Sequence, residues 1–180
     1  MMSKITQIRR RSIRLPHYDY AQNGAYFVTV CTHKFQCMFG QIVDAQMELN
    51  KYGKIVTEYW NEIPRHFPHV ELDAFVVMPN HMHGIIVIHN RVGATHGSPL
   101  QANGPAPGSI GAVIAQFKQA VTRRVRQHSQ LLHRIVWQRN YYEHVIRSES
   151  KFNQIREYIR NNPMNWGLDE NNHKTIGVAE

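Results

Sequence analysis

The segment 76–88 constrains the fold of this chain more than any other stretch. Apolar and β-branched residues stand on both sides of a Pro-Asn dipeptide, a pattern that predicts two antiparallel strands joined by a tight turn. Residues i and i+2 of a strand point to the same face of a sheet, so the imidazoles of His81 and His83 are expected to converge. Met82, between them, would face the other way into apolar packing.

Periodic patterns predict the remaining elements of the fold. We expect strands at 24–32, 70–78 and 82–89, a weaker strand at 41–49, a further strand within 135–145, and helices at 50–63, 109–127 and 148–162. This order describes a βαββαβ core with an appended C-terminal helix. It belongs to the α+β class, with an antiparallel sheet and helices on one face.

A chain of 180 residues is expected to form a single domain with its own core. We predict a basic arm at 1–20, the domain at 21–165 with a flexible Gly- and Pro-rich insertion at 91–108, and a polar, loosely ordered tail at 166–180. No apolar stretch reaches the length of a membrane span, and the N-terminal segment lacks the apolar core of a secretory signal. We therefore expect a cytoplasmic, nucleoid-associated protein with reduced cysteines and no membrane partner.

Basic residues outnumber acidic ones by 21 to 13, and the formal net charge of +8 favours nucleic acid as partner over a membrane surface. The arginines of the arm form a solvated tail, a phosphate contact or a base-reading element, of which we favour the phosphate contact. Those of the 109–127 helix form either a solvated face or a contact to the DNA backbone. Trp137 is either a core residue or a base-stacking residue beside Gln138. The candidate DNA contacts are Arg9, Arg10, Arg11, Arg14, Lys118, Arg123, Arg124, Arg126, Trp137 and Gln138.

Two side chains of the last predicted helix complete a candidate site. Two imidazoles on a stiff strand suit a divalent metal, although a His-x-His pair by itself is more often a surface or packing feature. Tyr158 and Asn162 lie four residues apart and share one helical face. If this face overlies the histidine strand, Asn162 can offer its carbonyl oxygen as a third ligand and Tyr158 can direct its hydroxyl at the group that the metal binds.

These motifs resemble a known family. The triplet His81-Met82-His83 matches the histidine–hydrophobic–histidine motif of the HUH single-strand endonucleases, and the chain resembles their single-tyrosine branch, within it the REP-associated tyrosine transposases. The similar stretches occur in the family's order and are RRSIRLPHYDYAQNGAYFVTVCT (10–32), VMPNHMHGII (77–86), VWQRNYYEHVIR (136–147) and YIRNNP (158–163).

The resemblance implies a ferredoxin-like core, a Mg²⁺ or Mn²⁺ ion and a tyrosine that cleaves single-stranded DNA. It assigns His81 and His83 as metal ligands, Tyr158 as the nucleophile, and Asn162 to a third-ligand position where related transposases often carry the longer Gln. Zinc also suits neutral imidazole. Relatives often act as dimers, so a homodimer is one expected assembly.

The expected function is that of a metal-dependent endonuclease and strand transferase for single-stranded DNA, acting in DNA transposition. It would cut beside DNA hairpins such as REP palindromes through a covalent phosphotyrosine. Two alternatives stay open: a hairpin-binding protein that does not cut, and a metal-dependent nuclease that uses water. Tyr141 and Tyr142 are rival nucleophiles, although they lie in a predicted strand and lack a carboxamide four residues on.

Overall fold

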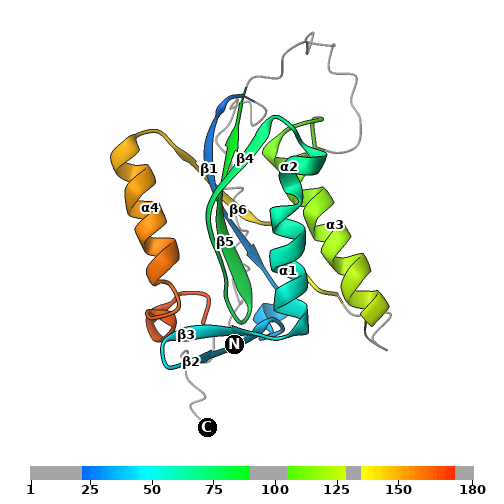
Figure 1. Ribbon diagram of the computed structural model, residues 1–180, viewed down its shortest axis with the longest axis vertical. Coiled ribbons are helices and arrows are strands. Elements are labelled where there is room, and N and C mark those ends of the chain that lie inside the picture. The colour runs from blue at the N-terminus through cyan, green and yellow to red at the C-terminus, as the bar shows by residue number, and fades with distance from the viewer. Residues whose placement is uncertain (1–21, 90–104, 129–134, 173–180) are drawn as a thin grey trace, which may run out of the picture.

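The computed structural model describes residues 22–89, 105–128 and 135–172, and a four-stranded antiparallel sheet lies at its centre (Figure 1). Its strands, in spatial order, are β4 (Val70–Val77), β5 (His81–Ile88), β1 (Gly24–Cys31) and β6 (Tyr142–Ile146). The β4–β5 hairpin turns through Pro79 and Asn80, as predicted, and β4 and β6 are the edges of the sheet.

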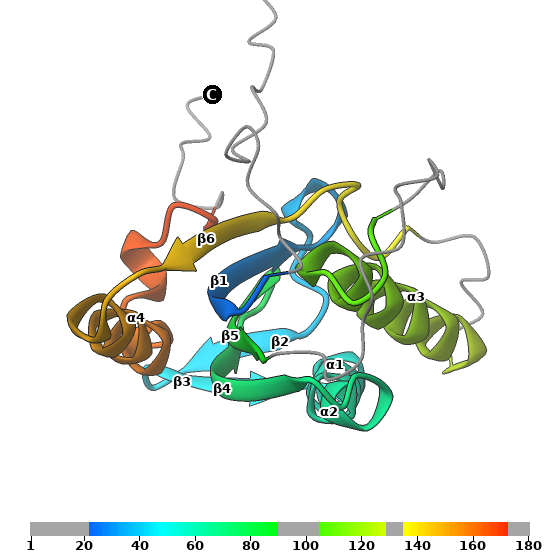
Figure 2. The ribbon, with the colours of Figure 1, turned by 90° about the horizontal axis from the view of Figure 1, so that it is seen from above.

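Helices cover both faces of this sheet. They are α1 (Lys51–Asn61), the short α2 (Ile63–His66), α3 (Ile110–His128) and α4 (Glu149–Asn161). Figures 1 and 2 show α1 and α3 on one face and α4 alone on the other, so the structure has three layers where we expected helices on one face. Three of these helices begin with N-caps, because the side chains of Asn50, Ser109 and Ser148 accept hydrogen bonds from backbone N–H groups of the helices that follow them.

The segment expected to form one weak strand is a hairpin of two. β2 (Gly40–Val43) pairs with β3 (Gln46–Leu49) as a separate two-stranded sheet. The turn residues Asp44 and Ala45 have φ angles of 48° and 61°, the left-handed conformation that a tight two-residue hairpin requires. With this hairpin and α2 set aside, the chain runs β1, α1, β4, β5, α3, β6 and α4, which is the predicted α+β alternation.

The alternation of side chains along β5 serves both faces. Met82 and Ile86 are fully buried in the larger apolar core beneath α1 and α3, whereas Ile85 belongs to the smaller cluster beneath α4. Gly84 faces the ring of Trp60, and a Cβ there would lie 2.3 Å from a ring carbon. The glycine therefore lets Trp60 of α1 pack directly onto the strand that carries the histidines.

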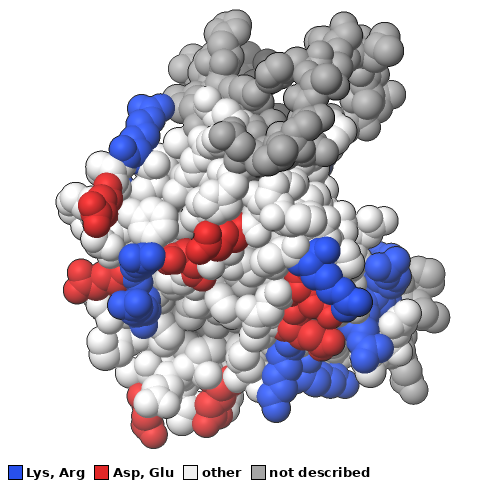
Figure 3. Space-filling model, turned by 45° about the horizontal axis from the view of Figure 1, so that its top comes forward, with Lys and Arg blue, Asp and Glu red and all other residues white. Residues whose placement is uncertain are grey.

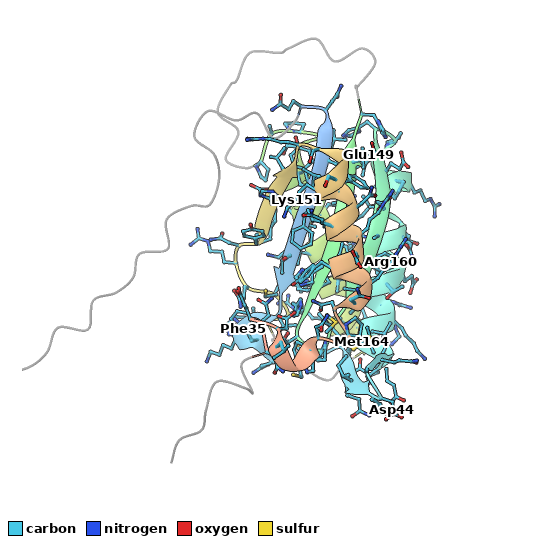
Figure 4. The ribbon with its side chains drawn as sticks, turned by 90° about the vertical axis from the view of Figure 1, so that its left-hand side faces the viewer. Phe35, Asp44, Glu149, Lys151, Arg160 and Met164 are labelled. Carbon is cyan, nitrogen blue, oxygen red and sulfur yellow. The ribbon has the colours of Figure 1, made fainter. Side chains whose placement is uncertain are left out.

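α4 docks on the sheet through apolar and ionic contacts. Ile155 and Ile159 pack with Ile85 of β5 in the smaller cluster. Arg156 donates two hydrogen bonds to the carboxylate of Asp73 on β4, at N–O distances of 2.7 and 2.6 Å. Figure 4 shows Glu149 at one end of this helix, and Met164 beyond the other end, near Asp44 of the β2–β3 turn.

The chain continues past α4 in ordered turns, contrary to the predicted loose tail. The 3₁₀ helix η2 (Trp166–Leu168) is followed by Asp169, whose carboxylate accepts the N–H of Asn171. Several predictions fall outside the described residues: the arm, most of the 91–108 insertion, and the tail from residue 173. Among the described helices, none is long and apolar enough to cross a membrane.

Candidate metal centre and nucleophile

His81 and His83 converge on the face of the sheet that α4 covers. Both imidazoles are buried, and their Nε2 atoms lie 3.0 Å apart. This is the arrangement that the two-residue period of the strand predicts, and Met82 faces the opposite core as expected. Two ring nitrogens are thus held at one point on the central part of the sheet.

The turn residue Asn80 sets the orientation of His81. Its side-chain oxygen lies 2.7 Å from Nδ1 of His81, while its side-chain nitrogen donates to the carbonyls of Phe35 and Asn171. An amide oxygen only accepts hydrogen bonds, so Nδ1 of His81 carries the proton and Nε2 keeps its lone pair for a ligand. Asn80 was missed in the sequence, where it appears only as a turn residue.

Thr29 of β1 holds the second imidazole. Its hydroxyl lies 2.8 Å from Nδ1 of His83, and the two residues face each other directly across the β1–β5 pairing. A hydroxyl both donates and accepts, so Thr29 supports His83 with the proton on either ring nitrogen. When it accepts from Nδ1, the lone pair of His83 on Nε2 is free for a metal.

Asp169 offers a third possible ligand atom, a carboxylate oxygen, which the sequence analysis did not identify. The group His81, His83 and Asp169 offers one ligand atom each, all within 4.8 Å of one another, and such a group can hold a metal ion. Asp169 Oδ2 lies 3.7 Å from His81 Nε2. No local pattern marks this residue, because it lies in a polar segment after the last helix and reaches the site only through the fold.

Asn162 is buried beside this group. Its side-chain nitrogen donates to Asp169 Oδ2 over 2.9 Å, and its side-chain oxygen is buried without a hydrogen-bond partner in the described part of the chain. A buried oxygen lacking a partner among the described residues, next to two imidazoles and a carboxylate, suits the binding of a cation. The contact with Asp169 also gives Asn162 a positioning role that the sequence analysis did not foresee.

Tyr158 of α4 reaches the same point. Its hydroxyl lies 3.2 Å from His83 Nε2, and the two rings are 5.2 Å apart. The residue as a whole stays 46% exposed. Burial and the nearby Asp169 carboxylate raise the pKa of Tyr158 to about 12, against which contact with Asn162 acts weakly. Without a cation, this phenol therefore keeps its proton at neutral pH.

The pKa values of the two imidazoles are shifted downward, in the opposite direction to that of Tyr158. Burial lowers the pKa of His81 to about 4, although the Asp169 carboxylate acts in the other direction. Burial, together with the neighbouring His81, also lowers the pKa of His83. Both rings are therefore neutral at pH 7, which is the state in which imidazole binds a metal.

The sequence of this chain is similar to that of a bacterial protein. A protein of Haemophilus influenzae, described as an uncharacterized protein, is 47% identical over 167 residues, covering 89% of this chain and 92% of that protein. The chain belongs to the family of this Haemophilus protein. No protein-family model matches the sequence.

A solved structure extends the comparison to the fold. A REP-associated tyrosine transposase bound to a REP hairpin superimposes with a TM-score of 0.56 at 20% identity, covering 88% of this chain and 77% of that chain. The predicted α+β fold is thus shared with a transposase of the kind that the sequence resembles. At this identity, the likeness establishes the fold alone.

The predicted DNA contacts differ in their surroundings. Trp137 is buried against Phe39 and Phe117, which favours its interpretation as a core residue, whereas Gln138 is partly exposed. Lys118 donates to three backbone carbonyls, so its ammonium is engaged within the fold. The basic residues Arg123 and Arg126 on α3 are exposed and Arg124 is partly exposed, and those of the arm lie outside the described residues.

Charge on the described surface is mixed. Figure 3 shows lysines and arginines in small groups with acidic side chains among them. Most of the basic excess lies in segments outside the described residues, chiefly the arm with Arg9, Arg10, Arg11 and Arg14. A nucleic acid that binds through net charge would therefore depend more on the arm than on this face.

Proposed function

We propose that this protein is a metal-dependent endonuclease and strand transferase for single-stranded DNA that cuts beside a DNA hairpin. The observation that carries the proposal is the Tyr158 hydroxyl 3.2 Å from His83 Nε2, at the group formed by His81, His83 and Asp169. A nucleophile placed against a set of metal ligands suits attack on a phosphate anion. The fold shared with a transposase bound to a REP hairpin supports a palindromic hairpin as the partner.

The residues of the chain have distinct roles in this proposal. His81, His83 and Asp169 would hold Mg²⁺ or Mn²⁺, with Asn162 as a further oxygen donor, and the ion would neutralise charge on the phosphate oxygens. Asn80 and Thr29 keep the two imidazoles in the orientation that binding requires.

Tyr158 performs the chemistry. Its oxygen forms a bond to phosphorus while the bond from phosphorus to the 3′-oxygen breaks, and the phenol proton ends on the released 3′-hydroxyl. The 5′ end stays on the protein as a phosphotyrosine. The reverse attack by a 3′-hydroxyl joins DNA strands again, so that strand transfer needs no other energy source.

One denaturing gel tests the proposal. End-labelled hairpin DNA with single-stranded flanks is incubated with Mg²⁺ and wild-type protein, Tyr158→Phe or Tyr142→Phe. We expect a covalent protein–DNA band with wild type and with Tyr142→Phe, no band with Tyr158→Phe, and no band for any protein in EDTA. Hairpin binding by Tyr158→Phe should stay within about twofold of wild type, because the phenol oxygen supplies chemistry rather than charge neutralisation.

The rival functions give other bands. A nuclease that uses water releases cut DNA without an adduct and keeps its activity in Tyr158→Phe. A protein that only binds hairpins shifts the DNA on a native gel and leaves it intact. If the adduct forms with Tyr158→Phe but not with Tyr142→Phe, the nucleophile is Tyr142 of β6 instead.

A further inference from the structure

Tyr142, a rival nucleophile in the sequence, lies exposed beside the site. It begins the edge strand β6 and is 37% exposed. Thr29 pairs with His83 on one side and with Tyr142 on the other, so these three side chains form one row on the face that α4 covers. Neighbouring strands are about 4.8 Å apart, which places the backbone of Tyr142 about 10 Å from that of His83.

The cover that α4 gives to this face is uneven. The helix packs most closely against β4 and much less against β6, and Figure 4 shows β6 beside α4 rather than beneath it. On β6, Tyr142 pairs with Thr29 and His144 pairs with Phe27, and both β6 residues are exposed. The β6 edge of this face is therefore open to solvent, whereas Thr29, between that edge and His83, is buried.

An aromatic ring connects this surface to the metal centre. Phe27 contacts Tyr142 edge-on at a centroid distance of 6.4 Å, and it stacks on His83 at 5.2 Å. It also contacts the ring of Tyr158 edge-on at 6.1 Å. Phe27 thus stands between Tyr142 and both site residues, and it supports the exposed ring in one orientation. A ring held in this way loses little conformational freedom when another ring stacks on it.

We propose that Tyr142 is the stacking surface for a nucleobase of single-stranded DNA next to the phosphate bound at the metal centre. This inference rests on the proposed function. A base is separated from its own phosphate by one sugar, and Tyr142 is separated from His83 and Tyr158 by one aromatic ring. Stacking accepts any base, so Tyr142 would hold the strand in place without reading its sequence.

The same geometry argues against Tyr142 as a nucleophile. Thr29 and Phe27 lie between its ring and the imidazoles, whereas Tyr158 approaches His83 directly. An exposed aromatic residue that is set back from the imidazoles by one intervening ring suits binding of the flanking strand.

Photo-crosslinking tests the stacking. The probe is a single-stranded oligonucleotide containing 5-iododeoxyuridine, bound in the presence of Mg²⁺ to the Tyr158→Phe protein, which lacks the proposed nucleophile and should not cut. Irradiation joins the modified base to an aromatic side chain stacked on it, and peptide mapping should find the crosslink at Tyr142. In the same background, Tyr142→Ala should raise Kd about tenfold and Tyr142→Phe by less than about twofold, because the ring rather than the hydroxyl binds.

Controls separate this inference from the proposed function. Tyr52→Ala removes a half-buried tyrosine from α1 on the opposite face of the sheet and should leave Kd unchanged, with circular dichroism confirming that each variant is folded. If Tyr158→Phe with Tyr142 intact binds no single-stranded DNA, the proposed function fails. If it binds, but crosslinks map elsewhere or Tyr142→Phe weakens binding as much as Tyr142→Ala, the stacking role alone is overturned.

Discussion

At the scale of single residues, the site combines two neutral imidazoles with a phenol that keeps its proton. Burial produces both effects, because it disfavours the charged form of each group: it lowers the pKa values of His81 and His83 and raises that of Tyr158. In the proposed function, the metal-free protein therefore has ligands ready to bind and a nucleophile that is inactive. A bound cation would reverse only the second condition, which links cutting to metal binding.

The buried histidines predict how stability depends on pH. Their pKa values in the unfolded chain are about 6.5, above the folded values, so the unfolded chain binds more protons between about pH 4 and 6.5. The free energy of unfolding of the metal-free protein should consequently fall as the pH is lowered from 7 to 5. Urea titrations in EDTA measure this slope, which His83→Gln should make shallower. Equal slopes in wild type and His83→Gln would contradict a lowered pKa of His83 in the folded protein.

Gly84 offers a second test at this scale. In Gly84→Ala the new Cβ meets the Trp60 ring at 2.3 Å, so the strand or the ring must move. We expect a loss of about 1–3 kcal/mol in the free energy of unfolding, as for other overpacked cores. Gly167→Ala is the matched control, because nothing lies within 4 Å of its added Cβ. Comparable urea midpoints for the two variants would show that the Trp60 ring moves aside without a loss of stability.

At the scale of elements, Lys118 connects α3 to the segment that leads into β6. Its Nζ donates to the carbonyls of Gln138, Arg139 and Asn140 at 2.7, 3.1 and 3.3 Å. Burial lowers the pKa of Lys118 to about 8, so the ammonium with its three donors persists at pH 7. This contact supports the entry to the strand that carries Tyr142.

Removal of this ammonium should destabilise the protein. Lys118→Met keeps most of the apolar stem but leaves three carbonyls without their donor, which should cost about 1–3 kcal/mol in the free energy of unfolding. Arg126→Met, an exposed change on the same helix, should cost less than about 0.5 kcal/mol. Urea denaturation measures both. An unchanged free energy of unfolding in Lys118→Met would mean that water replaces the hydrogen bonds of the ammonium at no cost in stability.

The same scale shows what the sequence could predict. The strand period placed His81 and His83 together, and the helical period placed Tyr158 and Asn162 on one face, because local geometry determines both relations. Asp169 and the orientation of Asn80 depend on a turn that folds back after α4, so no local period contains them. Trp137 was ambiguous, since an aromatic residue near a site packs in a core as readily as it binds a base.

At the scale of the whole molecule, the residues of the proposed site come from one chain. His81, His83, Asp169 and Tyr158 lie together within it, so the proposed cut of one strand does not require the predicted homodimer. The net charge of +8 and its concentration outside the described surface make the arm the main candidate for phosphate contacts. Affinity for DNA should therefore depend strongly on salt.

The arm can be tested by that salt dependence. Changing Arg9, Arg10, Arg11 and Arg14 to glutamine should reduce the slope of log Kd against log salt by about 3 for a single-stranded probe, at about 0.7 per phosphate contact. The matched variant changes Arg123, Arg124 and Arg126 on α3. Fluorescence anisotropy at several salt concentrations measures both slopes. An unaltered slope in the arm variant would mean that the arm is a solvated tail.

The contribution of Asp169 has a consequence for biosynthesis. A ribosome synthesises this residue after all the described strands and after α4, so a nascent chain has the two imidazoles and Tyr158 before it has the third grouped ligand. Truncated products that end soon after α4 would carry the tyrosine and both imidazoles but no carboxylate beside them. If the proposed cutting needs the Asp169 carboxylate, such products would bind the metal ion weakly and would not nick DNA.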